Sequence, residues 1–268
     1  MDNLLKSPKY TSNKDYIISG YIREYDISKA NINILYKYGV LSKEKYEYYL
    51  TVDRMTRQID IGLMQKDKRV SEILKNGIME YKKKFFIAND IREEDVLNIR
   101  NDAVFLLNKI ANVTKFDNIE FVNKNTYTSY YKLKNLEIYY FFDSINNIEK
   151  IDVKGIGDNV LGLHENYFLE FLKVVFSSAQ TESLVDTLDI IKNFYKQYIN
   201  LELDTGYYRS FNSESVYHIK SDISNYSVFR VYSIEDYNRE YLDISYNLQL
   251  IIQLYKYFSY MQLNNYKI

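Results

Sequence analysis

The sequence contains no cysteine and no tryptophan, and it has only two histidines and one proline in 268 residues. Without cysteine the chain can form no disulfide, no thiolate nucleophile and no thiolate metal site. Two histidines are too few for a histidine-rich zinc site, and their small number argues against a histidine-dependent hydrolase. His164 precedes a predicted helix and His218 lies in a predicted apolar strand. We therefore interpret both as structural residues.

Long apolar runs are absent as well. No stretch approaches the ~20 apolar residues that span a bilayer. Residues 1–14 are polar and lack the apolar segment of a signal peptide. We therefore expect a cytoplasmic protein with no membrane partner, located in the host cytoplasm if the source is a virus. The net charge of −1 argues against a uniformly basic nucleic-acid binder, but it leaves room for a local basic groove.

The residues that are abundant are aromatic and apolar. A hydrophobic share of 46% with 26% charged residues is typical of a globular chain, and this length allows one large or two modest domains. The 30 tyrosines, together with frequent Lys, Asn and Ile, indicate an AT-rich coding sequence. Such a composition is typical of a virus or phage of a low-GC bacterium. Many of the tyrosines then reflect base composition and not function.

Two segments each carry one carboxylate where an apolar strand is predicted to end. Residues 21–25 have the pattern of a strand, Asp26 ends it, and residues 28–36 have helical spacing. Residues 96–107 contain two β-rich runs on either side of Asn101-Asp102, the pattern of a hairpin. We predict that both segments pair in one antiparallel sheet with Asp26 and Asp102 at adjacent strand ends.

Two aspartates at adjacent strand ends can do one of two things. They can offer hard oxygen ligands to Mg²⁺, as a two-metal phosphoryl-transfer site requires. Alternatively, Asp26 caps the following helix and Asn101-Asp102 only forms a turn, since both are common roles for these residue types. The pattern alone favours the second interpretation.

The first segment also resembles the first palm motif of template-dependent DNA polymerases. In the family A form, an aspartate precedes a serine, a polar residue and a glutamate on the next helix. Asp26 and Ser28 match this form, while Asn31 stands at the glutamate position. The family B form continues with an aromatic-Pro-Ser-Ile-like stretch, to which residues 31–34 are loosely similar.

The second segment is similar to the third palm motif, a hairpin that carries His-Asp-Glu in family A or Thr-Asp-Ser in family B. Asp102 matches both forms, whereas Asn101 and Ala103 match neither. The order of the motifs is that of a polymerase, but their separation is short for a family A fingers region. The resemblance ends near Ile110, and it implies a palm-like sheet in which Asp26 and Asp102 are catalytic and bind Mg²⁺.

The region between the motifs is where a polymerase carries its nucleotide-binding helix. Residues 53–66 can form a helix from which Arg54, Arg57 and Lys66 project. By resemblance these cations would bind the phosphates of a nucleoside triphosphate. The Lys-aromatic-Tyr-Gly pattern of a fingers helix is missing, and ion pairs on a solvated helix face explain Arg54 and Arg57 equally well.

Lysines in two further segments are candidate contacts to a nucleic-acid backbone. Residues 70–88 predict an amphipathic helix whose exposed face carries Lys82 and Lys83. Residues 127–134 alternate aromatics with Lys132 and Lys134, and aromatics beside cations can stack bases and neutralise phosphates. A solvated face and ordinary cross-strand packing are the alternatives.

We predict an α+β protein with an antiparallel palm-like sheet and packed helices, followed by a second α+β region. The expected division is a flexible arm at residues 1–14, a palm-like region at 15–117 and a C-terminal region at 118–268. In the last region we expect three meandering strands at 118–122, 127–133 and 136–142, then helices at 165–177, 181–199 and 245–260, with strands at 215–219 and 227–232 between them.

Two functions remain open from the sequence. The first is a Mg²⁺-dependent nucleotidyltransferase, with nucleic acid or a larger assembly for replication or transcription as its partner. The second is a non-catalytic viral accessory protein that binds nucleic acid or a protein partner. Ala103 in place of a second acidic residue, the missing fingers motif and the small size of the chain favour the second, and the paired strand-end aspartates favour the first.

Overall fold

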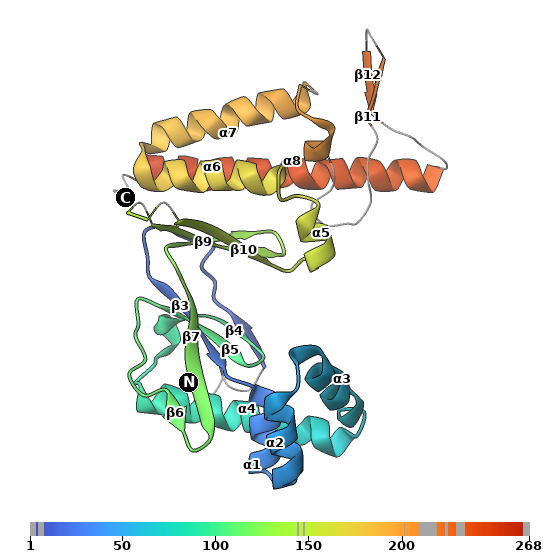
Figure 1. The fold of residues 1–268 in the computed structure, drawn as a ribbon. Coiled ribbons are helices and arrows are strands. Elements are labelled where there is room, and N and C mark those ends of the chain that lie inside the picture. The colour runs from blue at the N-terminus through green and yellow to red at the C-terminus, as the bar shows by residue number, and fades with distance from the viewer. Residues whose placement is uncertain are drawn as a thin grey trace. The chain divides into compact units, whose positions relative to one another are not determined.

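The structure is a computed structural model, which describes Leu4 and residues 8–143, 145–146, 148–200, 202–208, 219–222, 225–228 and 234–264. Runs of antiparallel strands and runs of helices follow one another along the chain, so the predicted α+β class is confirmed. The chain divides into two compact units (Figure 1). Unit 1 comprises Met1–Asn13 and Gly20–Thr126, and unit 2 comprises Lys14–Ser19 and Tyr127–Ile268.

Unit 1 is built on a six-stranded sheet with the order β1-β4-β5-β3-β7-β6. Its strands are β1 (Lys9–Thr11), β3 (Ile22–Ile27), β4 (Val96–Arg100), β5 (Ala103–Leu107), β6 (Lys115–Phe116) and β7 (Ile119–Tyr127). β4 and β5 form the predicted hairpin, and β3 pairs antiparallel with β5 from Ile22↔Leu107 to Asp26↔Ala103. The predicted pairing of the two motif segments is therefore confirmed.

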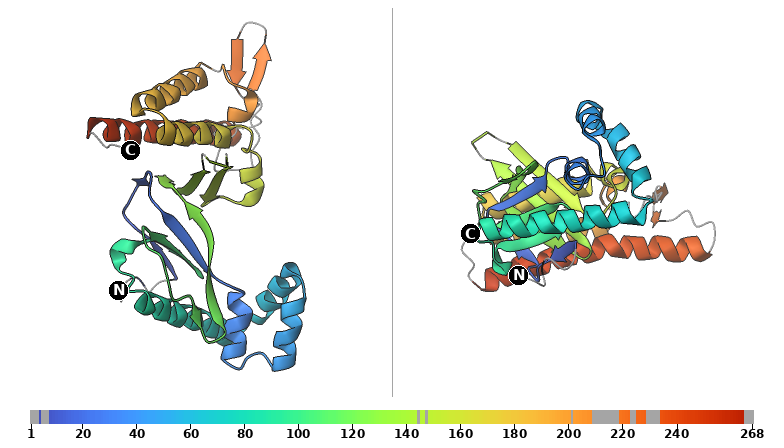
Figure 2. Two further views of the ribbon diagram at one scale, coloured as in Figure 1. Left: turned by 60° about the vertical axis from the view of Figure 1, so that its left-hand side comes forward. Right: turned by 90° about the horizontal axis from the view of Figure 1, so that it is seen from below.

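The helices of unit 1 follow β3 in one run: α1 (Ala30–Lys37), α2 (Lys43–Thr51), α3 (Arg54–Met64) and α4 (Lys68–Ala88). The side chains of Ser42, Asp53 and Asp67 accept hydrogen bonds at the starts of α2, α3 and α4 and fix where these helices begin. A short 3₁₀ helix, η1 (Glu93–Asp95), then leads into β4. α4 lies across one face of the sheet (Figures 1 and 2).

Alternation along β3 decides which side chains face α4. Tyr25 is buried and its ring lies 5.4 Å from that of Phe85 on α4, and Phe85 stacks on Phe121 of β7 at 4.2 Å. Because successive strand residues point to opposite faces, Asp26 points to the face away from α4. The core thus holds the sheet on α4 and leaves Asp26 outside it.

Unit 2 contains a four-stranded sheet with the order β10-β9-β8-β2. Its strands are β2 (Tyr16–Ile17), β8 (Ser129–Leu133), β9 (Leu136–Asp143) and β10 (Ile148–Lys154), and its helices are α5 (Asp158–Gly162), α6 (Phe168–Thr181), α7 (Leu184–Ile199) and α8 (Ile234–Leu263). A 3₁₀ helix, η2 (Thr205–Tyr208), and a separate hairpin of β11 (Ile219–Asp222) and β12 (Asn225–Val228) complete the described elements. Phe176 of α6 stacks on Tyr131 of β8 at 4.0 Å, which seals this second core.

Several predicted elements differ from the structure. The meander is wrong in its first strand: β7 lies between β3 and β6 in unit 1, while β8 and β9 form the predicted hairpin in unit 2. Ile119 and Phe121 are buried in the unit 1 core, so apolar alternation marked the strand correctly but not its partner. Lys9–Thr11, inside the expected flexible arm, pair with β4 as strand β1.

The second half of the chain brings further differences. Ser183, and not the residue at the predicted start of the helix, caps α7 by accepting from Asp186 N at 3.2 Å. β10 was not predicted. The expected strands at 215–219 and 227–232 fall largely outside the described residues, as does His218. In the described part of the chain, no helix is long and apolar enough to cross a membrane.

Candidate active site

The register of β3 on β5 brings the two motif aspartates together. Asp26 pairs with Ala103, the residue after Asp102, and Ile27 N donates to the Asp102 carbonyl at 3.3 Å. Asn101 has a φ of 50°, a left-handed conformation that asparagine tolerates, so the chain reverses tightly beside Asp26. Both carboxylates therefore lie at the same end of two neighbouring strands of the sheet.

The simpler interpretation gives Asp26 the role of a helix cap and Asn101-Asp102 the role of a turn, and the structure tests both roles. Asn101 and Asp102 form the turn between β4 and β5, as the simpler interpretation predicts. Asp26 does not cap the next helix, because Lys29 is the N-cap residue of α1 and no side chain caps that helix. The position of Asp26 therefore needs another explanation.

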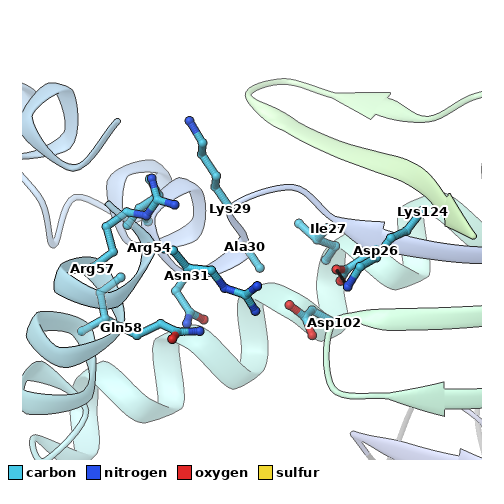
Figure 3. Close-up of a pocket in the computed structure, with 12 residues that line it drawn as sticks. Asp26, Ile27, Lys29, Ala30, Asn31, Arg54, Arg57, Gln58, Asp102 and Lys124 are labelled. Carbon is cyan, nitrogen blue, oxygen red and sulfur yellow. Dashed lines mark ion pairs between the residues drawn. The ribbon is translucent and has the colours of Figure 1, made fainter. Parts of the chain in front are cut away.

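Asp26 and Asp102 line a hollow of about 330 Å³, which we call the aspartate pocket (Figure 3). Asp26, Asp102 and Lys124 lie on the strand side of this pocket, and Arg54, Arg57 and Gln58 of α3 lie on the opposite side. The walls between them include Lys29 and Asn31. Two carboxylates thus face a helix that carries two guanidinium groups.

The carboxylates are held in an environment that opposes their ionisation. Burial raises the pKa of Asp26, although the Lys124 ammonium, 3.6 Å from its Oδ2, acts in the other direction. Burial raises the pKa of Asp102 as well, and the neighbouring negative charge of Asp26 adds to this rise. A cation placed between the two carboxylates would relieve both effects.

Lys82 supports the turn that carries Asp102. Its side chain is fully buried, and its Nζ donates to the Asn101 carbonyl at 2.8 Å. Burial lowers the pKa of Lys82 to about 8, an effect that the charge of Asp102 partly offsets. The prediction that Lys82 lies on an exposed face is therefore wrong, since Lys82 follows Ile78 by four residues and precedes Phe85 by three, which puts it on the buried side of α4.

The predicted phosphate ligands divide into two groups. Arg54 and Arg57 line the aspartate pocket, and Arg57 Nη1 also donates to the carbonyls of Tyr49 and Val52 at 3.2 Å each. These bonds tie α3 to α2 and hold Arg57 in place. Lys66 lies beyond the end of α3, is exposed, and does not line the pocket.

The other predicted nucleic-acid contacts lie outside this pocket. Lys83 is exposed on α4. Lys132 is half-buried on β8, and Lys134 lies in the β8–β9 turn with its Nζ 4.3 Å from the ring centroid of Tyr246. The latter two belong to unit 2. Their contact with nucleic acid stays a prediction.

Lys29 and Lys124 are pocket residues that the sequence analysis missed. Lys124 approaches Asp26 because β7 pairs beside β3. The sequence instead predicts residues 118–122 as a strand of the C-terminal sheet. Lys29 lies next to the predicted motif, and its left-handed φ of 48° marks a sharp change of direction between β3 and α1. The position of Lys29 directly after the Asp26-Ile-Ser28 motif was a usable signal, whereas no local signal marked Lys124.

The donor set suits a magnesium ion that is bound together with a phosphate. Mg²⁺ is commonly held by one or two carboxylates, with waters and substrate phosphates completing its shell. Asp26 and Asp102 supply two such carboxylates, and burial raises the pKa of both, with the charge of Asp26 adding to the rise at Asp102. The described residues contain no group of three or more His, Cys, Asp or Glu placed to hold a metal without such a ligand.

Fold and pocket together define an α+β protein whose first unit carries paired strand-end aspartates opposite a cationic helix. The chain belongs to the family of the bacteriophage PBS1 gene 130 protein, whose family model matches residues 1–259. It is thus a phage protein, in agreement with the source that its composition indicates. No curated protein matches the sequence.

Proposed function

We propose that unit 1 is a palm-like nucleotidyltransferase domain that acts on nucleic acid. The observation that carries this proposal is the β3–β5 register, which sets Asp26 beside Asp102 in a pocket faced by Arg54 and Arg57. Carboxylates at paired strand ends and cations on a facing helix are the two components that phosphoryl transfer to a hydroxyl requires.

Each residue has a distinct task in this proposal. Asp26 and Asp102 hold Mg²⁺, which when bound would offset the charge on the reacting phosphate. Arg54 and Arg57 bind the phosphates of a nucleoside triphosphate and favour charge that develops on the leaving group. Lys29, at the entry to α1, adds a third cation to the same pocket.

The test is primer extension with Mg²⁺ on DNA and RNA templates. Asp26→Asn and Asp102→Asn should each abolish incorporation, because losing one charged ligand removes several kcal/mol of transition-state stabilisation. Both variants should still fold, since neither carboxylate is part of the core. Asp189→Asn is the matched control, since Asp189 is exposed on α7 in unit 2, and it should remain active.

A second candidate is a non-catalytic accessory protein of a replication or transcription assembly. Lys124 favours it, because an internal ammonium 3.6 Å from Asp26 can neutralise the pocket without a metal. Ala103, at the position of the second acidic residue in the family A motif, points the same way. If the wild-type protein incorporates no nucleotide on any template but binds nucleic acid or a protein partner, this candidate replaces the first.

A further inference from the structure

A second hollow lies beside the aspartate pocket. We call it the Met79 pocket; it measures about 400 Å³ and lies along α4. The two hollows share Asn31 and Asp102, so they meet at these residues. All residues that line either hollow belong to unit 1.

The two hollows have different chemistry. The aspartate pocket combines four cationic side chains with two carboxylates. The Met79 pocket has an apolar wall formed by Leu74, Ile78 and Met79, and Lys75 is its one cation among the described residues. An apolar wall of this kind suits the face of a flat ring, whereas the first hollow suits phosphate.

Uncharged amides complete the Met79 pocket. The side chains of Asn31, Gln65 and Asn101 line it, and each offers both a donor and an acceptor. Within the described part of the chain, none of these three carboxamide groups forms a hydrogen bond. Amides in this position match the mixed donor and acceptor edge of a nucleobase.

We propose that the Met79 pocket binds the nucleoside of a nucleoside triphosphate whose phosphates occupy the aspartate pocket. This inference rests on the proposed function and adds to it that the protein itself, and not only a template strand, contacts the base. Asp102 and Asn31 then lie at the junction of sugar and phosphates, where the two hollows meet.

Calorimetric titration of the full chain with Mg²⁺ tests this inference, using ATP, GTP, CTP, UTP and inorganic tripolyphosphate as ligands. At least one nucleoside triphosphate should bind tenfold or more tightly than tripolyphosphate, which corresponds to ~1.4 kcal/mol. Met79→Trp should remove this advantage by filling the Met79 pocket, while tripolyphosphate affinity stays unchanged. Arg54→Gln should weaken both classes of ligand.

Asn76→Trp is the matched control, since Asn76 is exposed on α4 and lines neither hollow. Gln65→Leu provides a second test that adds no bulk; it should also weaken nucleoside triphosphate binding selectively, and it decides the matter if Met79→Trp does not fold. If tripolyphosphate binds as tightly as all four nucleotides, the nucleoside site is wrong and the phosphate site stands. If no ligand binds, both proposals are wrong.

Discussion

Lys82 is the residue whose environment most constrains the candidate site. Its buried ammonium group donates to the Asn101 carbonyl in the turn before Asp102. Burial lowers its pKa to about 8 from the ordinary value of 10.5. Between those two pH values the unfolded chain binds a proton that the folded chain lacks, so this group makes the free energy of unfolding rise with pH. The burial cost of the charge is present below about pH 8.

Lys82→Met should therefore have two effects. The variant leaves the Asn101 carbonyl without its donor, and it should be less stable than the wild type by about 1–3 kcal/mol above pH 10.5, where the wild type no longer bears the cost of a buried charge. It should also lose the rise in stability that Lys82 contributes between about pH 8 and 10.5. Urea unfolding across this range measures both, and Lys83→Met, one residue along on the exposed face, is the control. Equal slopes for the two variants would contradict the buried position of the charge.

Asp102 predicts the opposite dependence on pH. Its pKa is raised in the folded state, so the folded chain keeps this proton to a higher pH than the unfolded chain does. The free energy of unfolding therefore falls as the pH rises through the folded-state pKa. In the presence of a chelator, Asp102→Asn should have a higher thermal midpoint than the wild type near neutral pH. The difference should vanish below the ordinary pKa of the carboxyl group.

Adding Mg²⁺ provides the second half of that experiment. An ion that binds only the folded state stabilises it by mass action, so the midpoint of the wild type should rise with Mg²⁺ concentration. Asp102→Asn and Asp26→Asn should show no such rise. A wild-type midpoint that is insensitive to Mg²⁺ would favour the accessory role, in which Lys124 neutralises the pocket.

Residue types and local order were sufficient to predict the aspartates, because a strand end beside a turn can be recognised within a few residues. They were also sufficient for Arg54 and Arg57. The prediction for Lys82 is wrong because it puts Lys82 and Lys83 on one exposed face, although consecutive residues of a helix point to different sides of α4. To predict that Lys124 lies in the pocket, one would have to know which strand pairs beside β3.

At the scale of elements, the contact of α1 with α4 depends on Gly77. A Cβ added there would lie 2.5 Å from Ile34 Cγ2 and 3.1 Å from Tyr38 Cε2. Ile34 is fully buried, so it has no free space into which to move. Because α1 follows directly from β3, this contact also positions the pocket wall that carries Lys29 and Asn31.

Gly77→Ala should destabilise unit 1 by about 1–3 kcal/mol, because overpacking outweighs the gain in helix propensity. Gly62→Ala is the matched change on α3, where an added Cβ meets nothing within 4 Å. That variant should be more stable by about 0.5–1 kcal/mol. Chemical denaturation of both variants measures the contrast, and a stabilised Gly77→Ala variant would refute the packing of α1 on α4.

Helices were predicted more accurately than sheet partners, for a physical reason. The start of α3 depends on Asp53 and the amides of Met55 and Thr56, and the face of α4 depends on spacing within one segment. A strand such as β7 has the same alternation whichever sheet it joins. Its partners β3 and β6 are set by how the whole of unit 1 closes over α4, which no local pattern contains.

At the scale of the whole molecule, the chain passes between its two units early. Unit 2 takes Lys14–Ser19 from within the N-terminal segment, and β2 in that stretch pairs with β8 through Tyr16↔Tyr131 and Ile17↔Tyr130. Unit 1, in contrast, is complete before Tyr127 except for that short loop. The two units have separate hydrophobic cores, so neither core needs residues of the other.

This topology predicts an asymmetry between two fragments. Residues 1–126 contain the core of unit 1, both aspartates and both pocket arginines, so they should fold alone and retain Mg²⁺-dependent nucleotide binding. Residues 127–268 lack β2 and expose the edge of β8 that it covers, so they should be less stable and prone to association. Amide proton dispersion in NMR spectra and Mg²⁺ titration of each fragment measure the two outcomes. Joining residues 14–19 to the second fragment through a flexible linker should restore its stability, and a folded second fragment without them would show that β2 is dispensable.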